Sequence, residues 1–339
     1  MQFWKAIPLA TAGLALTASL ALADTLGDVK ARGSLKCVGN TGLAGFGVAD
    51  DKGQWTGLDV DVCRAIAAAV LGDSTAVEII PTTAKERFTV LQSGEGDVLS
   101  RNTTWTLSRD TQLGMNFAGI NFYDGQGFMV PADLGIQSAR ELDGATICVQ
   151  TGTTTELNLA DYFRRNDMSY ESVVFETNDE ARNAFEQGRC DAYTTDASGL
   201  AAERSVASNP SAYVILPDII SKEPLGPAVR QGDDVWFNIV RWTLFAMIAA
   251  EELGVTSANV DDQKANSQNP SVKRLLGTEG DLGPMLQLDN EWAYRIIKQV
   301  GNYSESFDRN VGPDTPLGLS RGLNALWTDG GLMYAPPIR

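Results

Sequence analysis

The stretch LQSGEGDVLSRNTTWT, residues 91–106, indicates the fold because residues 185–199, FEQGRCDAYTTDASG, repeat its plan. In both stretches a helical segment ends on a glycine, an aspartate follows three positions later, and an apolar strand comes next. The glycines are Gly94 and Gly188, and glycine permits the left-handed turn that ends a helix. Such units are common, so the repeat alone is a weak signal, but it suggests two halves built on one plan.

Predicted strands and helices alternate around both stretches. In the first half, strands alternate with helices in the order 34–40, 55–72, 76–82, 85–94 and 97–100. In the second half, the same order of strand and helix runs through 145–152, 153–166, 171–176, 178–188 and 190–196. This alternation predicts the α/β class, with two parallel or mixed sheets flanked by helices. A length of 339 residues agrees with two domains of ~150 residues.

The composition excludes several classes of function. The chain has 27 Lys and Arg against 43 Asp and Glu, a formal net charge of −16. Nucleic acids and anionic membranes select basic surfaces, so neither is expected as a partner. The chain has no histidine, which removes Ser-His-Asp and Cys-His catalysis and histidine metal sites. Chemistry based on a Ser-Lys pair or on carboxylates stays open.

Residues 1–23 have the features of a cleaved signal peptide. Lys5 precedes an apolar run, and the sequence ALA directly before Asp24 has the form of a signal peptidase site. A buried helix or membrane anchor is the alternative, but the run is short for a bilayer span and rich in Ala and Thr. The first cysteine, Cys37, comes too late for lipid attachment. We therefore expect a free protein in the periplasm of a Gram-negative bacterium.

The four cysteines agree with an oxidising compartment. They allow three pairings, and sequence alone does not choose between them. Pairing Cys37 with Cys63 and Cys148 with Cys190 would keep each disulfide bond inside one half, whereas a bond between halves would join parts that need to move. Four unpaired buried thiols are the alternative. The paired CxxC spacing of a zinc ribbon is absent, and we expect neither a metal nor a cofactor.

Polar residues follow the predicted strands at their carboxyl ends, where open α/β sheets bind ligands. Arg109 follows the strand at 97–100, and Asp196 ends the strand at 190–196, so one end offers a cation and the other an anion. Between them, Thr153 and Thr154 open a helix whose free N–H groups would bind a carboxylate or phosphate. Ordinary helix capping by either threonine is the alternative.

Six stretches together resemble extracytoplasmic solute-binding proteins of the polar amino acid family, the ligand-capturing components of ABC importers. They are GLDVDVCRAIA (57–67), TAKERFTVLQSGEGDVLSRNTTWTLSRD (83–110), ICVQTGTTTELNLADYF (147–163), TTDASGL (194–200), SKEPLGPAVRQGDD (221–234) and GLNALWTDGGLMYAPPIR (322–339). The resemblance covers the mature chain and is nearest to general L-amino-acid-binding and glutamate/glutamine/aspartate/asparagine-binding proteins. It implies a two-lobed periplasmic binding protein fold of type II with a two-strand hinge.

The resemblance implies that seven residues bind the backbone of an amino acid: Arg109, Thr104, Asn102, Gly152, Thr153, Thr154 and Asp196. Arg109, in the family pattern T-x-T-x-x-R, grips the α-carboxylate, and Thr104 contacts the ligand backbone. Asn102 and Asp196 match positions that bind the α-ammonium. The Gly-Thr-Thr motif binds the carboxylate from the second lobe. Because the opposite charges come from different lobes, binding would favour a closed state.

The resemblance places four further residues around the ligand side chain: Asn40, Leu43, Phe46 and Ala84. Relatives of narrow specificity often have an aromatic or large aliphatic residue at the position of Ala84. A small residue there predicts a site that accepts several L-amino acids, polar ones foremost. Gly45 and Ile120-Asn121 depart from the family pattern, which affects the shape of this pocket and not the backbone clamp.

The same plan predicts the limits of the lobes. Lobe 1 comprises 24–126 and 228–339, lobe 2 comprises 132–222, and the hinge comprises 127–131 and 223–227. The apolar helix at 234–254 could be taken for a membrane span, but its charged residues favour a helix packed on lobe 1. The role of the residues after about 255 is not indicated.

The sequence therefore predicts the substrate-binding component of an ABC importer for L-amino acids, acting as a monomer with membrane permease subunits as partners. An enzyme of the dehydratase type on the same fold is the alternative. Without histidine, its acid or base would be Asp196, Glu156 or a lysine. A third possibility, the sensing domain of a receptor, would need a transmembrane segment or signalling module, and none follows in the sequence.

Overall fold

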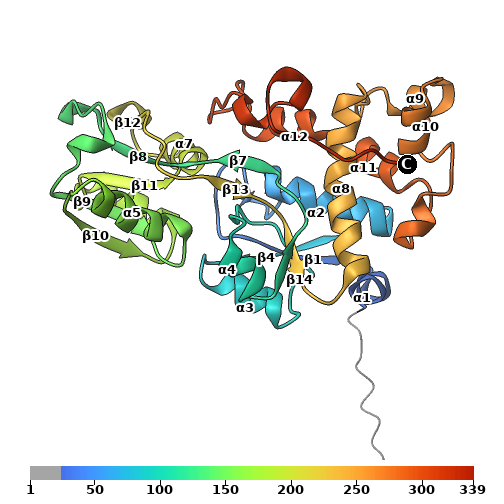
Figure 1. Cartoon of the computed structure of the whole chain (residues 1–339), viewed down its shortest axis with the longest axis horizontal. Coiled ribbons are helices and arrows are strands. Elements are labelled where there is room, and N and C mark those ends of the chain that lie inside the picture. The colour runs from blue at the N-terminus through green and yellow to red at the C-terminus, as the bar shows by residue number, and fades with distance from the viewer. Residues whose placement is uncertain (1–23) are drawn as a thin grey trace, which may run out of the picture.

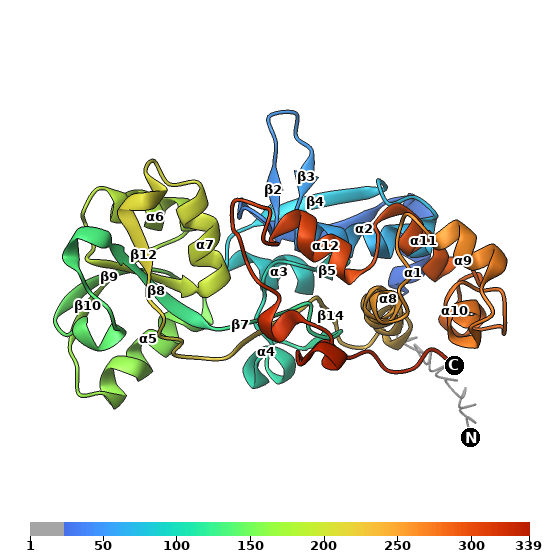
Figure 2. The same cartoon turned by 90° about the horizontal axis from the view of Figure 1, so that it is seen from above.

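The computed structural model describes residues 24–339, and the predicted signal peptide lies outside the described residues. Two five-stranded sheets form two lobes, which lie side by side and are joined by extended chain (Figures 1 and 2). We name lobe 1 after the sheet with strand order β4-β1-β5-β14-β6 and lobe 2 after the sheet with order β10-β9-β11-β8-β12. Helices flank both sheets, which confirms the predicted α/β class.

Lobe 1 has a mixed sheet. Its strands are β1 (Leu35–Asn40), β4 (Val77–Thr82), β5 (Val98–Leu99), β6 (Met115–Phe117) and β14 (Ala228–Arg230). β1 runs parallel to β4 and β5, whereas β14 is antiparallel to β5 and β6. Cys37 of β1 belongs to the main core with helix α2 (Leu58–Leu71), while Val38 packs in a second cluster with Leu91 of α3 (Glu86–Gln92). Successive side chains of a strand point to opposite faces, so helices cover both faces of this sheet.

Lobe 2 repeats this arrangement. Its strands are β8 (Gln126–Pro131), β9 (Ala145–Gln150), β10 (Tyr170–Phe175), β11 (Ala192–Asp196) and β12 (Tyr213–Ile215). Helix α5 (Thr154–Arg165) packs on one face, where Phe163 meets Ile147. Helices α6 (Asn178–Glu186) and α7 (Ala197–Ser205) cover the other face, where Phe185 meets Cys148.

Two short strands cross between the lobes. β7 (Phe122–Asp124) pairs antiparallel with β13 (Glu223–Leu225), and both run between the two sheets in Figure 1. Residues 127–131, predicted as one half of the hinge, lie instead within β8 of lobe 2. The reason is that β8 pairs with β11 over 126–129, with Met129 opposite Tyr193, and with β12 over 129–131. The crossing thus lies a few residues nearer the N-terminus than the sequence suggested.

The chain after β14 returns to lobe 1. Helix α8 (Asp234–Glu252) buries Trp236, Ile239 and Leu244 in the main core. It is followed by four short helices, α9 (Val260–Asn266), α10 (Pro270–Leu275), α11 (Trp292–Gln299) and α12 (Tyr303–Asn310). Within residues 24–339, no helix combines the length and apolarity that crossing a membrane requires.

The C-terminal residues support a crossing strand. The side chain of Asn324 accepts a hydrogen bond from the backbone N–H of Tyr123 at 2.7 Å and donates one to its C=O at 3.1 Å. The neighbouring Phe122 packs between two rings, with centroid distances of 5.3 Å to Phe46 and 6.1 Å to Phe307 of α12. The segment whose role the sequence left open therefore holds β7 against lobe 1.

Two disulfide bonds each stay inside one lobe. Cys37 of β1 is joined to Cys63 of α2, with Cα atoms 6.2 Å apart. Cys148 of β9 is joined to Cys190, which precedes β11, with Cα atoms 5.6 Å apart. No disulfide bond among the described residues links the lobes, so neither bond restrains their relative movement.

Candidate functional site

Predicted site residues from both lobes meet at the interface between the lobes. The Oγ1 atom of Thr104 in lobe 1 lies 3.2 Å from that of Thr154 in lobe 2. Lys85 of lobe 1 and Glu176 of lobe 2 form an ion pair at 3.0 Å. Two separate contacts thus bring the carboxyl ends of the two sheets together, where open α/β sheets bind ligands.

Arg109 is a buried cation on a short helix. Thr106 caps helix α4 (Leu107–Thr111), and its side chain accepts from the backbone N–H of Arg109 at 3.3 Å. The guanidinium donates from Nη1 to the C=O of Thr104 at 2.8 Å. The side chain is only 6% exposed. Burial lowers the pKa of Arg109 to about 10, against the opposing influence of Glu223 and Asp196. Its charge therefore sits in a poorly solvated place, where an anion would bind strongly.

Asp196 is a buried carboxylate on the other lobe. It ends β11 and precedes α7, yet its side chain caps none of the helix N–H groups. Burial raises its pKa well above the ordinary value, and the charges of Asp124 and Glu223 add to this effect. Arg87 and Arg109 act in the opposite direction. A carboxylate left without a capping role in this setting is suited to bind a cation.

Glu223 joins the two lobes and was missed by the sequence analysis. Its Oε2 atom accepts from Thr104 and from Thr154, both at 2.7 Å. Its Oε1 atom accepts from Asn158 and Ser221, both at 2.6 Å. The side chain lies in the crossing strand β13 and is 1% exposed. Two of the three threonine hydroxyls predicted to contact a ligand, those of Thr104 and Thr154, thus donate to Glu223 in this arrangement.

The Gly-Thr-Thr motif opens helix α5 as predicted in outline. Thr153 is the N-cap, and its hydroxyl accepts from the N–H of Glu156 at 3.2 Å. Gly152 has φ +73°, and a Cβ there would lie 2.7 Å from the Cγ atom of Lys85 across the interface. Glycine is therefore needed both for the backbone conformation and for the approach of the lobes. Thr153 performs ordinary helix capping, the alternative that the sequence left open.

Asn102 is placed beside Asn40. Its backbone is left-handed at φ 32°, and its N–H donates to Oδ2 of Asp59 at 2.6 Å. Its Oδ1 atom accepts from Nδ2 of Asn40 at 3.0 Å. The structure thus links a residue predicted to bind the ammonium with one predicted for the side-chain pocket.

The other three pocket residues are buried. Leu43 is 3% exposed, Phe46 is 1% exposed and Ala84 is fully buried. Leu43 and Phe46 belong to the main core of lobe 1, so their first role is packing. Their contact with a ligand side chain stays a prediction.

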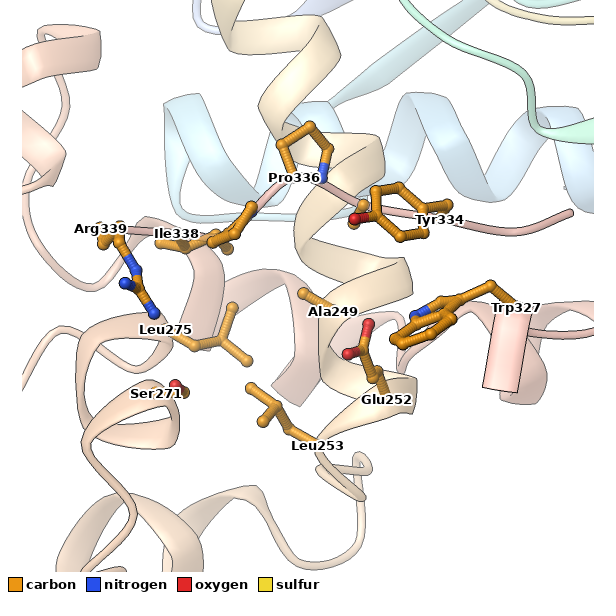
Figure 3. A pocket seen from close by; sticks show the side chains of 12 residues that line it. Ala249, Glu252, Leu253, Ser271, Leu275, Trp327, Tyr334, Pro336, Ile338 and Arg339 are labelled. Atoms are coloured by element: carbon orange, nitrogen blue, oxygen red, sulfur yellow. The ribbon is translucent and has the colours of Figure 1, made fainter. Parts of the chain in front are cut away.

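A separate pocket lies on lobe 1 and contains none of the predicted site residues. It has a volume of about 310 Å³ and is formed by α8, α10 and the C-terminal tail. Figure 3 shows Ala249 and Glu252 of α8 between Trp327 on one side and Arg339 on the other. Among residues 24–339, no group of three or more His, Cys, Asp or Glu side chains could hold a metal ion.

Known proteins resemble this chain in sequence and in fold. Residues 35–258 match the family of bacterial extracellular solute-binding proteins, family 3. The general L-amino acid-binding periplasmic protein AapJ of Rhizobium johnstonii is 61% identical over 96% of each chain. The glutamate/glutamine/aspartate/asparagine-binding protein BztA of Rhodobacter capsulatus is 58% identical over 96% of each chain. A solved structure, an ABC transporter periplasmic binding protein from Brucella ovis with glutathione bound, is 60% identical with a TM-score of 0.92 and covers 94% of this chain and 100% of its own.

Proposed function

The chain belongs to family 3 of the bacterial extracellular solute-binding proteins, and on that premise we propose that it captures free L-amino acids and delivers them to the permease of an ABC importer. The chain is a binding protein and not an enzyme, because relatives identical at 58 to 61% are named as amino-acid-binding proteins. The dehydratase alternative is therefore set aside.

One observation carries the proposal. Arg109 and Asp196 are buried, carry opposite charges, come from different lobes and influence each other's pKa. A free amino acid is a zwitterion, so its α-carboxylate suits Arg109 and its α-ammonium suits Asp196. A guanidinium can bind a carboxylate through two parallel hydrogen bonds. Neither lobe alone satisfies both ends of the ligand, so the ligand stabilises the closed arrangement.

The remaining site residues complete the proposed contacts. Asn102, Thr104, Gly152, Thr153 and Thr154 surround the ligand backbone, and Asn40, Leu43, Phe46 and Ala84 surround its side chain. For Thr104 and Thr154 to donate to a ligand, their hydroxyls must turn from Glu223. The hinge is the pair of strands β7 and β13.

The proposed ligands are several L-amino acids, with acidic and amide side chains foremost. The names of AapJ and BztA support this range. Glutathione is a second candidate, because the Brucella ovis relative holds it. Its γ-glutamyl end carries the same free ammonium and carboxylate, so the clamp of Arg109 and Asp196 suits it as well.

We further propose that residues 1–23 are removed on export to the periplasm and that the mature protein is a monomer. The proposed lobes comprise 24–121 with 226–339 and 126–222, joined by the strands β7 and β13. Size-exclusion chromatography with light scattering and N-terminal sequencing of the exported protein test both statements.

Calorimetry of the mature protein tests the function. Six compounds are titrated separately: glutamate, glutamine, aspartate, asparagine, alanine and glutathione. Each ligand is then recovered, and its mass is measured by mass spectrometry. We expect one ligand per chain, recovered intact. If none of the compounds binds, the proposal is contradicted. If a ligand is recovered chemically changed, the result would instead support the dehydratase alternative.

A further inference from the structure

The pocket between α8, α10 and the C-terminal tail is separate from the proposed amino acid clamp. Its volume of about 310 Å³ lies within the range of about 300–1,000 Å³ that is typical of small-molecule sites. Its lining includes none of the residues proposed to bind an amino acid. Both α10 and the tail lie beyond residues 35–258, which match the family. Part of this pocket is therefore built from chain that the family match does not include.

Two aromatic rings form a corner at one end of the pocket. The ring centroids of Trp327 and Tyr334 are 5.6 Å apart, and the ring planes are inclined at 64°. The backbone holds them in place, because the N–H of Trp327 donates to the C=O of Met333 at 3.0 Å and Met333 is buried. The rings are 50% and 61% exposed, and neither is in contact with a lysine or arginine head group of residues 24–339. Their faces are therefore open to a cation from outside the chain.

A carboxylate lies at the same end of the pocket. Figure 3 shows Glu252 beside Trp327 and Tyr334, whereas Arg339 lies at the other end. Glu252 is exposed and forms no ion pair within the described part of the chain. A charge and two ring faces thus point to a ligand of positive charge.

The position of Glu252 in α8 makes its surroundings more negative. It is the last residue of the helix, where free C=O groups carry partial negative charge, and the last turn has no basic residue. The preceding Glu251 has its own cation, since Arg321 lies 2.8 Å away. Burial raises the pKa of Glu251 against the charge of Arg321, and the charges of Asp308 and Asp329 add to the rise. The negative charge of this region therefore exceeds the positive charge that the protein supplies to it.

We propose that this end of the pocket binds a small organic cation with a quaternary ammonium group, such as choline. The rings of Trp327 and Tyr334 contact its methyl groups, and Glu252 with the C-terminal end of α8 supplies the opposite charge. A primary ammonium has three N–H donors that need acceptors, and the corner offers them one carboxylate. A quaternary ammonium has no N–H donor, so it suits two ring faces better.

Titrations followed by saturation-transfer NMR of the mature protein test the site. Choline is compared with dimethylbutanol, in which a carbon atom replaces the charged nitrogen, and with ethanolamine, which lacks the methyl groups. We expect choline to bind more tightly than either analogue by about 2- to 30-fold, the range that one cation–π contact spans.

Two variants of the protein locate the site. Glu252→Gln removes the charge at nearly constant volume and should lower choline affinity about two- to fivefold, the worth of an exposed ion pair. Trp327→Leu removes one ring and should lower choline affinity about 2- to 30-fold. Both variants should keep wild-type affinity for glutamine in calorimetry. Asp196→Asn is the reverse control, because it should lose glutamine affinity and keep choline affinity. Glu171→Gln, on the edge of lobe 2, should change neither.

Three results would overturn the proposal. Equal affinity for choline and dimethylbutanol would show an apolar pocket without selectivity for charge. A loss of choline affinity in Asp196→Asn but not in Glu252→Gln would place choline at the amino acid clamp. Binding to phosphatidylcholine vesicles without binding to free choline would identify a lipid surface, and not a small molecule, as the partner. If Trp327→Leu fails to fold by circular dichroism, Glu252→Gln and the comparison of ligands decide the result.

Discussion

Thr104 of lobe 1 and Thr154 of lobe 2 donate to the same carboxylate oxygen, Oε2 of Glu223, each at 2.7 Å. A single side chain of the crossing strand thus joins the two lobes through hydroxyl groups that the sequence assigned to the ligand. Both contacts require a hydrogen-bond acceptor at this position, because a hydroxyl group can donate only to an atom that has a lone pair.

The first prediction concerns this acceptor. Glu223→Gln replaces one carboxylate oxygen by an NH₂ group, which cannot accept, so in either orientation of the amide two of the four donors around this side chain lose their acceptor. We expect the free energy of unfolding of the ligand-free protein to fall by about 1–3 kcal/mol, measured by urea denaturation. Glu176→Gln is the control, since it breaks only the exposed pair with Lys85 and should cost under about 1 kcal/mol. Equal effects of the two changes would contradict the assignment.

The second prediction concerns the carboxylate clamp. Arg109→Lys keeps a cation but not the two parallel donors of a guanidinium. We expect amino acid affinity to fall about 10- to 100-fold in calorimetry, with glutamate, glutamine and alanine affected alike. The fold should persist, as judged by circular dichroism, and Arg164→Lys serves as the control. Near-native affinity would return Arg109 to a structural role.

The third prediction concerns pH and binding. Burial and the charge of Asp124 raise the pKa of Asp196, and the pKa of Asp124 itself is raised to about 6. A ligand ammonium requires ionised Asp196, so protonation competes with binding as the pH falls. Glutamine, whose side chain does not titrate, should bind more weakly at about pH 5 than at about pH 8. Asp196→Asn should bind weakly at both values, and a pH dependence that survives in this variant would contradict the explanation.

The fourth prediction concerns pH and stability. Burial raises the pKa of Glu203 to about 7, although Arg182 lies 2.9 Å away and opposes the shift. The folded state thus binds the proton more tightly than the unfolded state. The resulting stabilisation is complete below about pH 4.5 and is lost as the pH rises to about 7, with an upper limit of about 3 kcal/mol.

The variant Glu203→Gln tests whether stability falls with rising pH because of this carboxyl group. Glutamine cannot ionise but retains an oxygen for Arg182, so the variant should lack this loss of stability. The difference in unfolding free energy between wild type and variant, measured in urea across this range, should change in favour of the variant as the pH rises. A difference that is independent of pH would refute the prediction. Glu171→Gln, on the exposed edge of β10, is the control.

The sequence predicted the fold well where local patterns determine it. The repeated helix–glycine–strand units end in β5, which leads to Arg109 on α4, and in β11, which ends on Asp196. The crossing was misplaced because β8 is buried at all but its last residue and so lacks alternation, and β7 has only three residues, too few for a periodic pattern. Strand pairing, and not composition, shows that β7 crosses between the lobes and that β8 belongs to lobe 2.

The site was predictable only in part, for a physical reason. Glu223 is a lone glutamate in its stretch, and its importance comes from partners 65 to 119 residues away. Arg87 and Arg101 lie within quoted motifs, but only the tertiary structure shows that they are buried without an ion pair. Cations at such positions in a sequence are ordinarily solvated, so no local signal distinguishes them.

The interrupted course of lobe 1 affects how the protein is assembled. Its sheet stays incomplete until β14 enters between β5 and β6, more than a hundred residues after β6. Lobe 2 is a continuous run of chain that contains its own sheet and its own disulfide bond. In a chain that leaves the membrane N-terminus first, lobe 2 can finish folding while the strands of lobe 1 still wait for β14 and α8. Lobe 2, although second in the sequence, can therefore complete its sheet before lobe 1 does.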